Sequence, residues 1–67
     1  MKDSSKEILE RLIENEFEST PNTPWMEESL FEIIDAAYEV GLDHLGSELE
    51  LRLHPDQRRR FLNLKSA

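Results

Sequence analysis

Cysteine is absent from this sequence of 67 residues. Its absence excludes a disulfide-stapled scaffold and any metal site built on thiolates. It is also typical of reducing compartments, so we expect a cytoplasmic protein. A chain of this length has the size of one small domain, whose core usually contributes only ~3–5 kcal/mol. We therefore expect residues 1–67 to form a single small domain with a thin core.

Long hydrophobic runs are also missing. The longest, residues 36–38, has three residues, whereas a helix that spans a membrane needs about 20. The first ten residues, MKDSSKEILE, contain an early acid and no apolar segment of the kind found in signal peptides. The sequence therefore predicts no membrane span, no signal peptide and no membrane partner.

Positive charge is scarce and unevenly placed. The chain has eight Lys and Arg against 15 Asp and Glu, a net charge of −7. Residues 1–50 carry 14 acidic and three basic residues, a net charge of −11, while residues 51–67 carry five basic residues and one acid, a net charge of +4. No Lys or Arg lies between residues 12 and 51. A field of this sign repels phosphate backbones, so we expect the partner to be another protein with a basic surface.

A first helix is predicted near the start of the chain. Ser4 and Glu7 have the spacing of a capping box, in which each side chain satisfies a free backbone amide of the first turn. Glu16 falls within the apolar stripe of this helix, so either the helix stops near Asn15 or the carboxylate reaches the rim of the stripe; we favour fraying near Asn15. The residues of the stripe are Ile8, Leu9, Leu12, Ile13 and Phe17.

A second helix is expected after a loop that contains prolines. Thr23 would be its N-cap and Pro24 its first residue. Gly41 would end it in the left-handed conformation, with Leu42 making the hydrophobic contact of a Schellman cap. Its apolar stripe covers about half of the circumference, more than one neighbouring helix needs, so we expect a homodimer. The stripe consists of Met26, Leu30, Phe31, Ile33, Ile34, Ala37, Tyr38 and Val40.

The C-terminal part is compatible with two structures. Asp43 can cap a third helix, which Gly46 weakens by about 1 kcal/mol relative to alanine. Residues 49–54 alternate apolar and polar, so a turn at residues 54–57 would make them a strand of a hairpin. Composition favours helix, because no β-branched residue lies in this part of the chain and Pro55 suits a first helical turn. The predicted fold class is therefore all-α, a small bundle of three to four short helices; the alternative is two helices plus a C-terminal β-hairpin. The face of the third helix would hold Leu42, Leu45, Leu49 and either Arg52 or Leu53.

No motif for catalysis or cofactor binding is present. His44 and His54 lie ten residues apart, without the spacing of a known metal motif, so ordinary surface or capping histidines are favoured. The sequence has no glycine-rich phosphate loop, no GxSxG and no nucleophile beside a histidine. We therefore expect no enzyme activity, no cofactor and no metal.

The segment around Gly41 resembles a helix-turn-helix. In that interpretation residues 43–53 would be the recognition helix. This helix offers three acids and only Arg52 as a base, whereas DNA affinity comes mainly from Lys and Arg. A helical hairpin with Gly41 as its C-cap explains the same residues, so binding of nucleic acid is disfavoured.

Three sets of residues are candidates for partner contact. For Trp25, which falls outside the main stripe, we expect the C-terminal helix to pack against it; the alternative is an exposed anchor of an interface. We expect the arginines to lie across the acidic body and neutralise Glu28 or Glu39 of the same or a partner chain. The sets are the aromatic residues Trp25, Phe31 and Tyr38, the acids Glu28, Glu32, Asp35 and Glu39, and the run Arg58, Arg59 and Arg60.

These features predict a small cytoplasmic interaction protein or regulator that acts through an acidic surface and an apolar helix seam. One alternative is a regulator that binds nucleic acid through the arginine run. Another is an acidic mimic of nucleic acid that occupies the basic groove of a DNA- or RNA-binding protein. Salt-dependent binding to duplex DNA would distinguish the first alternative, and retention on a basic protein with competition by DNA would distinguish the second.

Overall fold

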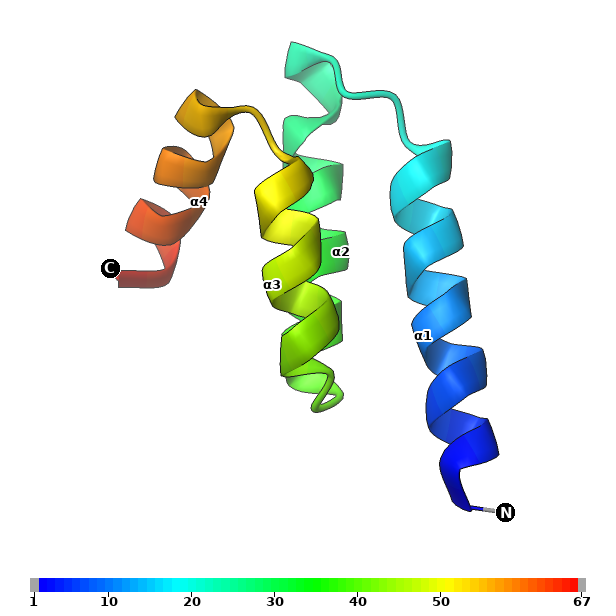
Figure 1. Ribbon diagram of the computed structural model, residues 1–67. Coiled ribbons are helices and arrows are strands. Elements are labelled where there is room, and N and C mark those ends of the chain that lie inside the picture. Colours follow the sequence, from blue (N-terminus) through cyan, green and yellow to red (C-terminus); the bar gives the residue numbers. More distant parts are fainter. Residues whose placement is uncertain (1, 67) are drawn as a thin grey trace.

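The computed structural model describes the backbone of residues 2–66 and the side chains of residues 5–66. All regular structure in this part is helical, and no strand is present in it (Figure 1). The elements are α1 (Lys2–Ser19), the 3₁₀ turn η1 (Pro24–Met26), α2 (Glu27–Glu39), α3 (Asp43–Arg52) and α4 (Pro55–Ser66). The prediction of an all-α bundle is confirmed with four helices, and the alternative with a C-terminal β-hairpin is wrong.

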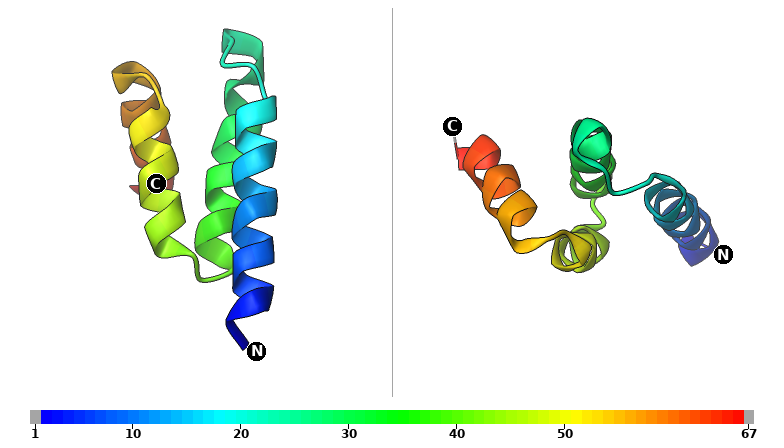
Figure 2. Two further views of the ribbon diagram at one scale, coloured as in Figure 1. Left: turned by 45° about the vertical axis from the view of Figure 1, so that its right-hand side comes forward. Right: turned by 90° about the horizontal axis from the view of Figure 1, so that it is seen from above.

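The helices are arranged around a central hairpin of α2 and α3. Helix α1 runs antiparallel to α2 on one side of this hairpin, and α4 lies on the other side (Figures 1 and 2). Seen from above, the four helices follow a zigzag from α1 to α4 (Figure 2). The core lies between them, and its largest fully buried side chains are Leu30, Ile34, Leu45, Leu49 and Phe61.

Helix α1 is longer than the sequence pattern predicts. It begins at Lys2 and continues to Ser19, so Ser4 is not its N-cap and the helix does not fray near Asn15. The expectation failed because the buried stripe is narrow, and Glu16 faces solvent instead of interrupting it. Only Ile13 and Phe17 are buried, with Leu9 packed partly against the core.

The two ends of α2 differ in how well the sequence predicts them. Thr23 precedes η1 rather than the α-helix, and its hydroxyl is buried without a hydrogen-bond partner among the described residues. At the other end Gly41 has φ +85°, its amide donates to Tyr38 (3.0 Å), and the Leu42 amide donates to Ala37 (2.8 Å). These two bonds form the predicted Schellman cap, and Leu42 is buried as expected.

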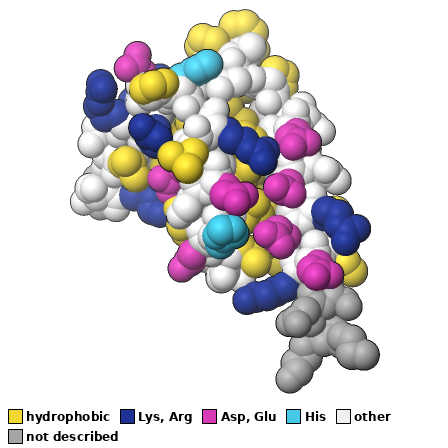
Figure 3. All heavy atoms as spheres, in the orientation of Figure 1, with side chains coloured by type: hydrophobic (Ala, Val, Ile, Leu, Met, Phe, Trp, Pro, Cys, Tyr) yellow, Lys and Arg dark blue, Asp and Glu magenta, His cyan; other side chains and the backbone are white. Residues whose placement is uncertain are grey.

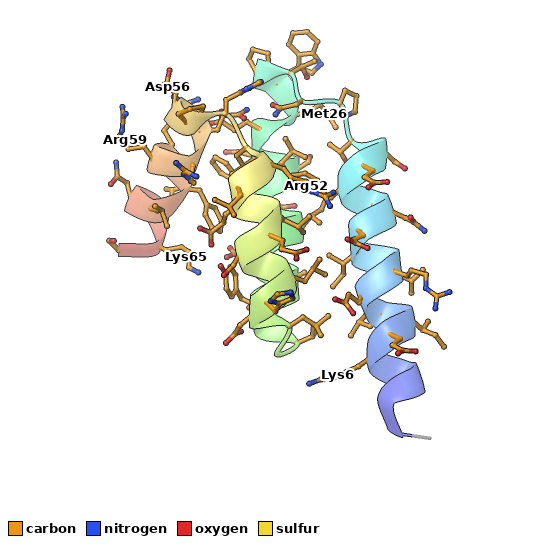
Figure 4. All side chains as sticks on the ribbon, in the orientation of Figure 1. Lys6, Met26, Arg52, Asp56, Arg59 and Lys65 are labelled. Atoms are coloured by element: carbon orange, nitrogen blue, oxygen red, sulfur yellow. The ribbon has the colours of Figure 1, made fainter. Side chains whose placement is uncertain are left out.

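Ion pairs of Arg52 connect α3 to the outer helix α1. Arg52 points from α3 toward α1 (Figure 4), where its Nη1 lies 3.3 Å from Oε2 of Glu18 and its Nη2 lies 3.7 Å from Oε2 of Glu14. Leu53, not Arg52, therefore completes the buried face that Leu42, Leu45 and Leu49 begin.

Gln57 fixes the start of α4. Its Oε1 accepts a hydrogen bond from the backbone amide of His54 (3.0 Å), as the third residue of a capping box does. Its Nε2 donates to Oδ1 of Asn22 (2.7 Å), which ties the loop before η1 to the first turn of α4. Gln57 is only 5% exposed, so this amide serves two connections within the interior.

Gly46 has a packing role that its position in a helix does not reveal. A Cβ atom at this residue would lie 2.7 Å from Cε2 of Tyr38, so only glycine lets the ring approach α3 this closely. The Tyr38 hydroxyl donates a hydrogen bond to Glu50, and Nζ of Lys65 lies 3.7 Å from the ring centroid. Tyr38 therefore joins α2, α3 and α4.

Candidate protein-interaction surface

The outer side of α2 carries a row of four exposed acids. Glu28 lines a hollow on the α4 side of α2, and Glu32 lines a groove on the α1 side. The row therefore forms a crest between two concave surfaces of different chemistry. Its members are the predicted Glu28, Glu32, Asp35 and Glu39.

The α4 side contains the closest ion pair of the described residues. Arg60 donates from Nε to Oε2 of Glu27 (2.9 Å) and from Nη2 to Oε1 (2.7 Å). This hydrogen bonding lowers the pKa of Glu27 below its ordinary value of 4.5 and raises the pKa of Arg60. Within the chain, the expectation that the arginines neutralise Glu28 or Glu39 is therefore corrected, because the acid that Arg60 reaches is Glu27, at the start of α2. Pairing with these acids of a partner chain stays a prediction.

The other two arginines lie apart from the acidic crest. Arg59 points away from the bundle (Figure 4), and its Nη1 lies 3.8 Å from Oδ1 of Asp56 on its own helix. Arg58 is half-buried. In the view of Figure 3 the basic side chains are scattered over α4, α3 and α1, whereas acidic side chains gather over α1 and α3. The arginine run thus does not form one continuous basic face.

The three predicted aromatic residues have different environments. Phe31 is buried, with its ring centroid 5.3 Å from that of Phe61. Tyr38 is half-buried beneath Lys65, and burial together with the hydrogen bond to Glu50 raises its pKa above 10.0. Both residues hold α4 to α2 and are not free for a partner. Trp25 remains on the surface.

Trp25 is 79% exposed, the largest value among the exposed large hydrophobic residues. The expectation that the C-terminal helix packs against it is wrong. Helix α4 instead packs on the side of α2 that carries Phe31, because Phe61 fills that site. Trp25 is directly before Met26, which points into the space between η1 and α1 (Figure 4).

An open groove of about 350 Å³ lies between α1 and α2. We call it the α1–α2 groove. None of the residues that line it is a Lys or Arg, and Ser29 and Ala36 are small. Its lining consists of Glu16, Thr20, Met26, Ser29, Glu32, Ile33 and Ala36.

Exposed apolar residues continue this groove along both helices. Leu12 and Ile8 precede Glu16 by four and eight residues, so they lie on the same side of α1. They are 59% and 56% exposed. Val40 follows Ala36 by four residues on α2 and is 44% exposed. The groove is therefore part of a longer apolar strip, and Trp25 directly precedes Met26 of its lining in the chain.

Sequence reasoning missed the contribution of α1 to this surface. Ile8 and Leu12 belong to the predicted stripe, and a wheel alone gives no reason to leave them outside the core. Their positions depend on the angle at which α1 meets α2, because only Leu9, Ile13 and Phe17 reach the interior. Ser29 and Ala36 could be noticed as small residues on the side of Trp25, but not as the floor of a groove.

The described side chains contain no group of three His, Cys, Asp or Glu placed to hold a metal ion. His44 Nε2 lies 3.2 Å from Oε2 of Glu48, and both side chains are largely exposed. A hollow of about 370 Å³ lies beside the Arg60–Glu27 pair, where Asn22 and Gln57 bond to each other.

Within residues 2–66, no helix has the length and the hydropathy needed to cross a membrane. Comparison of the chain with protein families, with curated proteins and with solved structures finds no match. The functional argument therefore depends on the geometry of the chain itself.

Proposed function

We propose that this chain is a protein-interaction module that binds a partner protein through the α1–α2 groove and Trp25. The observation that carries the proposal is the 79% exposure of Trp25, which directly precedes Met26, a residue in the lining of the α1–α2 groove. Tryptophan is enriched among the residues that dominate binding energy, because one side chain buries a large area and also offers an N–H donor.

The shape of the α1–α2 groove favours a protein segment over a small molecule. A small-molecule site normally encloses most of its ligand and directs several polar groups toward it. This groove is open, and its apolar surface extends along both helices through Leu12 and Val40. Extended apolar surfaces with a polar margin are typical of protein contacts.

The arginine run supports binding of nucleic acid less well. Arg60 is engaged with Glu27 and Arg59 lies near Asp56, so their charges face acids of the same chain. An acidic mimic of nucleic acid would instead use the crest of α2 on a basic protein, and it stays an alternative to this proposal. The expected homodimer stays a prediction, although α4 covers Phe31 and Tyr38 and thus part of the stripe that motivated it.

Site-specific photo-crosslinking tests the proposal. A benzophenone side chain would replace Leu12, which is 59% exposed on the apolar strip that continues the α1–α2 groove, and in a matched control it would replace His44, which is exposed on α3. In lysate of the source organism, the Leu12 variant should form a discrete adduct with another protein that the His44 variant does not form. Adducts at His44 alone, or the same adducts at both positions, would contradict the proposed surface.

A further inference from the structure

We infer that the segment bound in the α1–α2 groove is an amphipathic helix with Lys or Arg beside its apolar stripe. This inference rests on the proposed function and adds the chemistry of the partner. It depends on three properties of the groove: its helical walls, its small residues and its unpaired carboxylates.

The walls of the groove favour a helix as the occupant. Residues 2–66 contain no strand, so they offer no sheet edge to which an extended peptide could add. An extended segment in an apolar groove would leave backbone amides without partners, whereas a helix satisfies them internally. A helix can lie along α1 and α2 and place apolar residues every three or four positions against them.

The dimensions and the floor of the groove agree with this occupant. From Ser29 to Val40 the strip on α2 runs for about 16 Å at 1.5 Å per residue, or three helical turns. Ser29 and Ala36 lie on the floor of this strip, and their short side chains let another helix approach closely. Leu12 on the α1 side and Val40 on the α2 side would then contact its apolar stripe.

The carboxylates at the two margins of the groove indicate which residues flank the apolar stripe of the bound helix. Glu16 borders the groove from α1 and Glu32 borders it from α2. Among the described side chains, no Lys or Arg forms an ion pair with either carboxylate, and the ion pair of α4 lies on the other side of α2. A helix with basic residues on both sides of its apolar stripe would therefore meet an opposite charge on each margin.

A second copy of the chain fits the groove less well. Pairing two grooves face to face would place Glu16 and Glu32 of both copies near one another without a cation. Like charges at close range in a desolvated interface oppose association. The partner with a basic amphipathic helix has no such conflict.

Two synthetic peptides of equal length test the inference on the full chain. Both have the same leucine stripe, and the flanking positions are Lys in one and Glu in the other. Isothermal titration and the fluorescence of Trp25, the only tryptophan, report binding. We expect the Lys peptide to bind one to one, at least about tenfold more tightly than the Glu peptide, and to bind less tightly as salt is added. Equal affinity for the two peptides, or no binding of the Lys peptide, would overturn the inference.

Variants distinguish the groove from the general negative charge of the protein. Ala36→Leu keeps an exposed position helical but fills the floor, so it should abolish binding of the Lys peptide. Glu16→Gln and Glu32→Gln should each weaken binding several-fold. Glu7→Gln is the matched control. It removes the same charge from a different edge of α1, the edge on which Glu14 and Glu18 face Arg52. Circular dichroism verifies that each variant is folded, and an equal effect of Glu7→Gln would contradict the role of the groove.

Two further outcomes separate the inference from the proposed function. If the adduct at Leu12 forms but the Lys peptide does not bind, the groove is an interaction site whose partner has other chemistry, and only the inference fails. Sedimentation of the chain alone examines self-association. A dimer that Ala36→Leu disrupts would identify a second copy as the occupant and would also overturn the inference.

Discussion

The acidic crest of α2 separates two flanks of this helix. The α4 flank and the α1 flank differ in which groups of the chain face α2. On the α4 flank the chain supplies its own partners, since Arg60 pairs with Glu27, Phe61 contacts Phe31, and Lys65 lies over Tyr38. Both flanks are hollowed at the surface, but on the α1 flank no Lys or Arg forms an ion pair with Glu16 or Glu32 among the described side chains. No Lys or Arg lines the α1–α2 groove. The difference separates groups that stabilise the fold from groups that remain available to a partner.

The largest difference between the flanks is expected from truncation of one apolar side chain on each. Phe61 is 1% exposed on the α4 flank, and Phe61→Ala should cost about 3–5 kcal/mol, because it removes buried contacts and leaves a cavity. Leu12 is 59% exposed on the α1 flank, and Leu12→Ala should cost about 0.5 kcal/mol or less. Urea denaturation followed by circular dichroism measures both, and similar costs would contradict the assignment of the two flanks.

A smaller effect is expected where α2 and α3 approach closely. Gly46→Ala should destabilise the chain by about 1–3 kcal/mol, because the new methyl group would overlap the ring of Tyr38. This cost opposes the helix-propensity gain of about 1 kcal/mol that alanine normally gives over glycine. In a Tyr38→Ala background the same substitution should stabilise. If Gly46→Ala stabilises the wild-type chain, the ring does not occupy the place described.

The next effect concerns the ion pair of the α4 flank. Arg60→Gln should lower the melting temperature more than Arg59→Gln, because Arg60 makes two hydrogen bonds to Glu27 and Arg59 lies 3.8 Å from Asp56. Pairing lowers the pKa of Glu27 in the folded chain below 4.5. The pair therefore stabilises the folded state above this pH, and the stabilisation is lost as the pH falls through the folded-state pKa.

Melting curves of the wild type and both variants across pH check this expectation. The difference between the wild type and Arg60→Gln should be present near neutral pH and should shrink below pH 4.5. A difference that grows on acidification would mean that Glu27 is not the carboxylate that Arg60 stabilises.

The smallest effect on stability is expected at Trp25, the exposed residue that we propose as an anchor for the partner. Trp25→Ala should change the free energy of unfolding by less than about 0.5 kcal/mol, since the side chain is 79% exposed. Acrylamide quenching of Trp25 in the free wild-type chain should be close to that of a free tryptophan derivative. Strong protection from quenching would show that the side chain is covered in solution.

The sequence predicts local features of this fold well. The chain is left-handed at residue 41, a conformation that few residues other than glycine adopt. The Schellman cap therefore forms at Gly41, where it is expected. Pro55 and the polar residues after it begin α4, because the physical requirements of a first helical turn involve neighbouring residues only. The burial of Leu42, Leu45 and Leu49 also follows from spacing within one helix.

Features that depend on how helices pack could not be predicted in this way. A helical wheel of α1 does not show that Leu12 faces solvent, because the angle between α1 and α2 selects the buried residues. The partner of Arg60 and the exposure of Trp25 have the same origin, since both depend on which side of α2 receives α4. The groove itself combines residues of two helices, and no pattern within one of them identifies it.

The assignment of the binding surface to one flank of α2 can be tested residue by residue in one titration. The chain is labelled with ¹⁵N, and its backbone amide chemical shifts are followed as the Lys peptide is added. Shifts should concentrate at Leu12, Glu16, Ser29, Glu32 and Ala36, and the amides of α4 should change little. Shifts that concentrate on the α4 flank, around Arg60 and Leu64, would contradict the account.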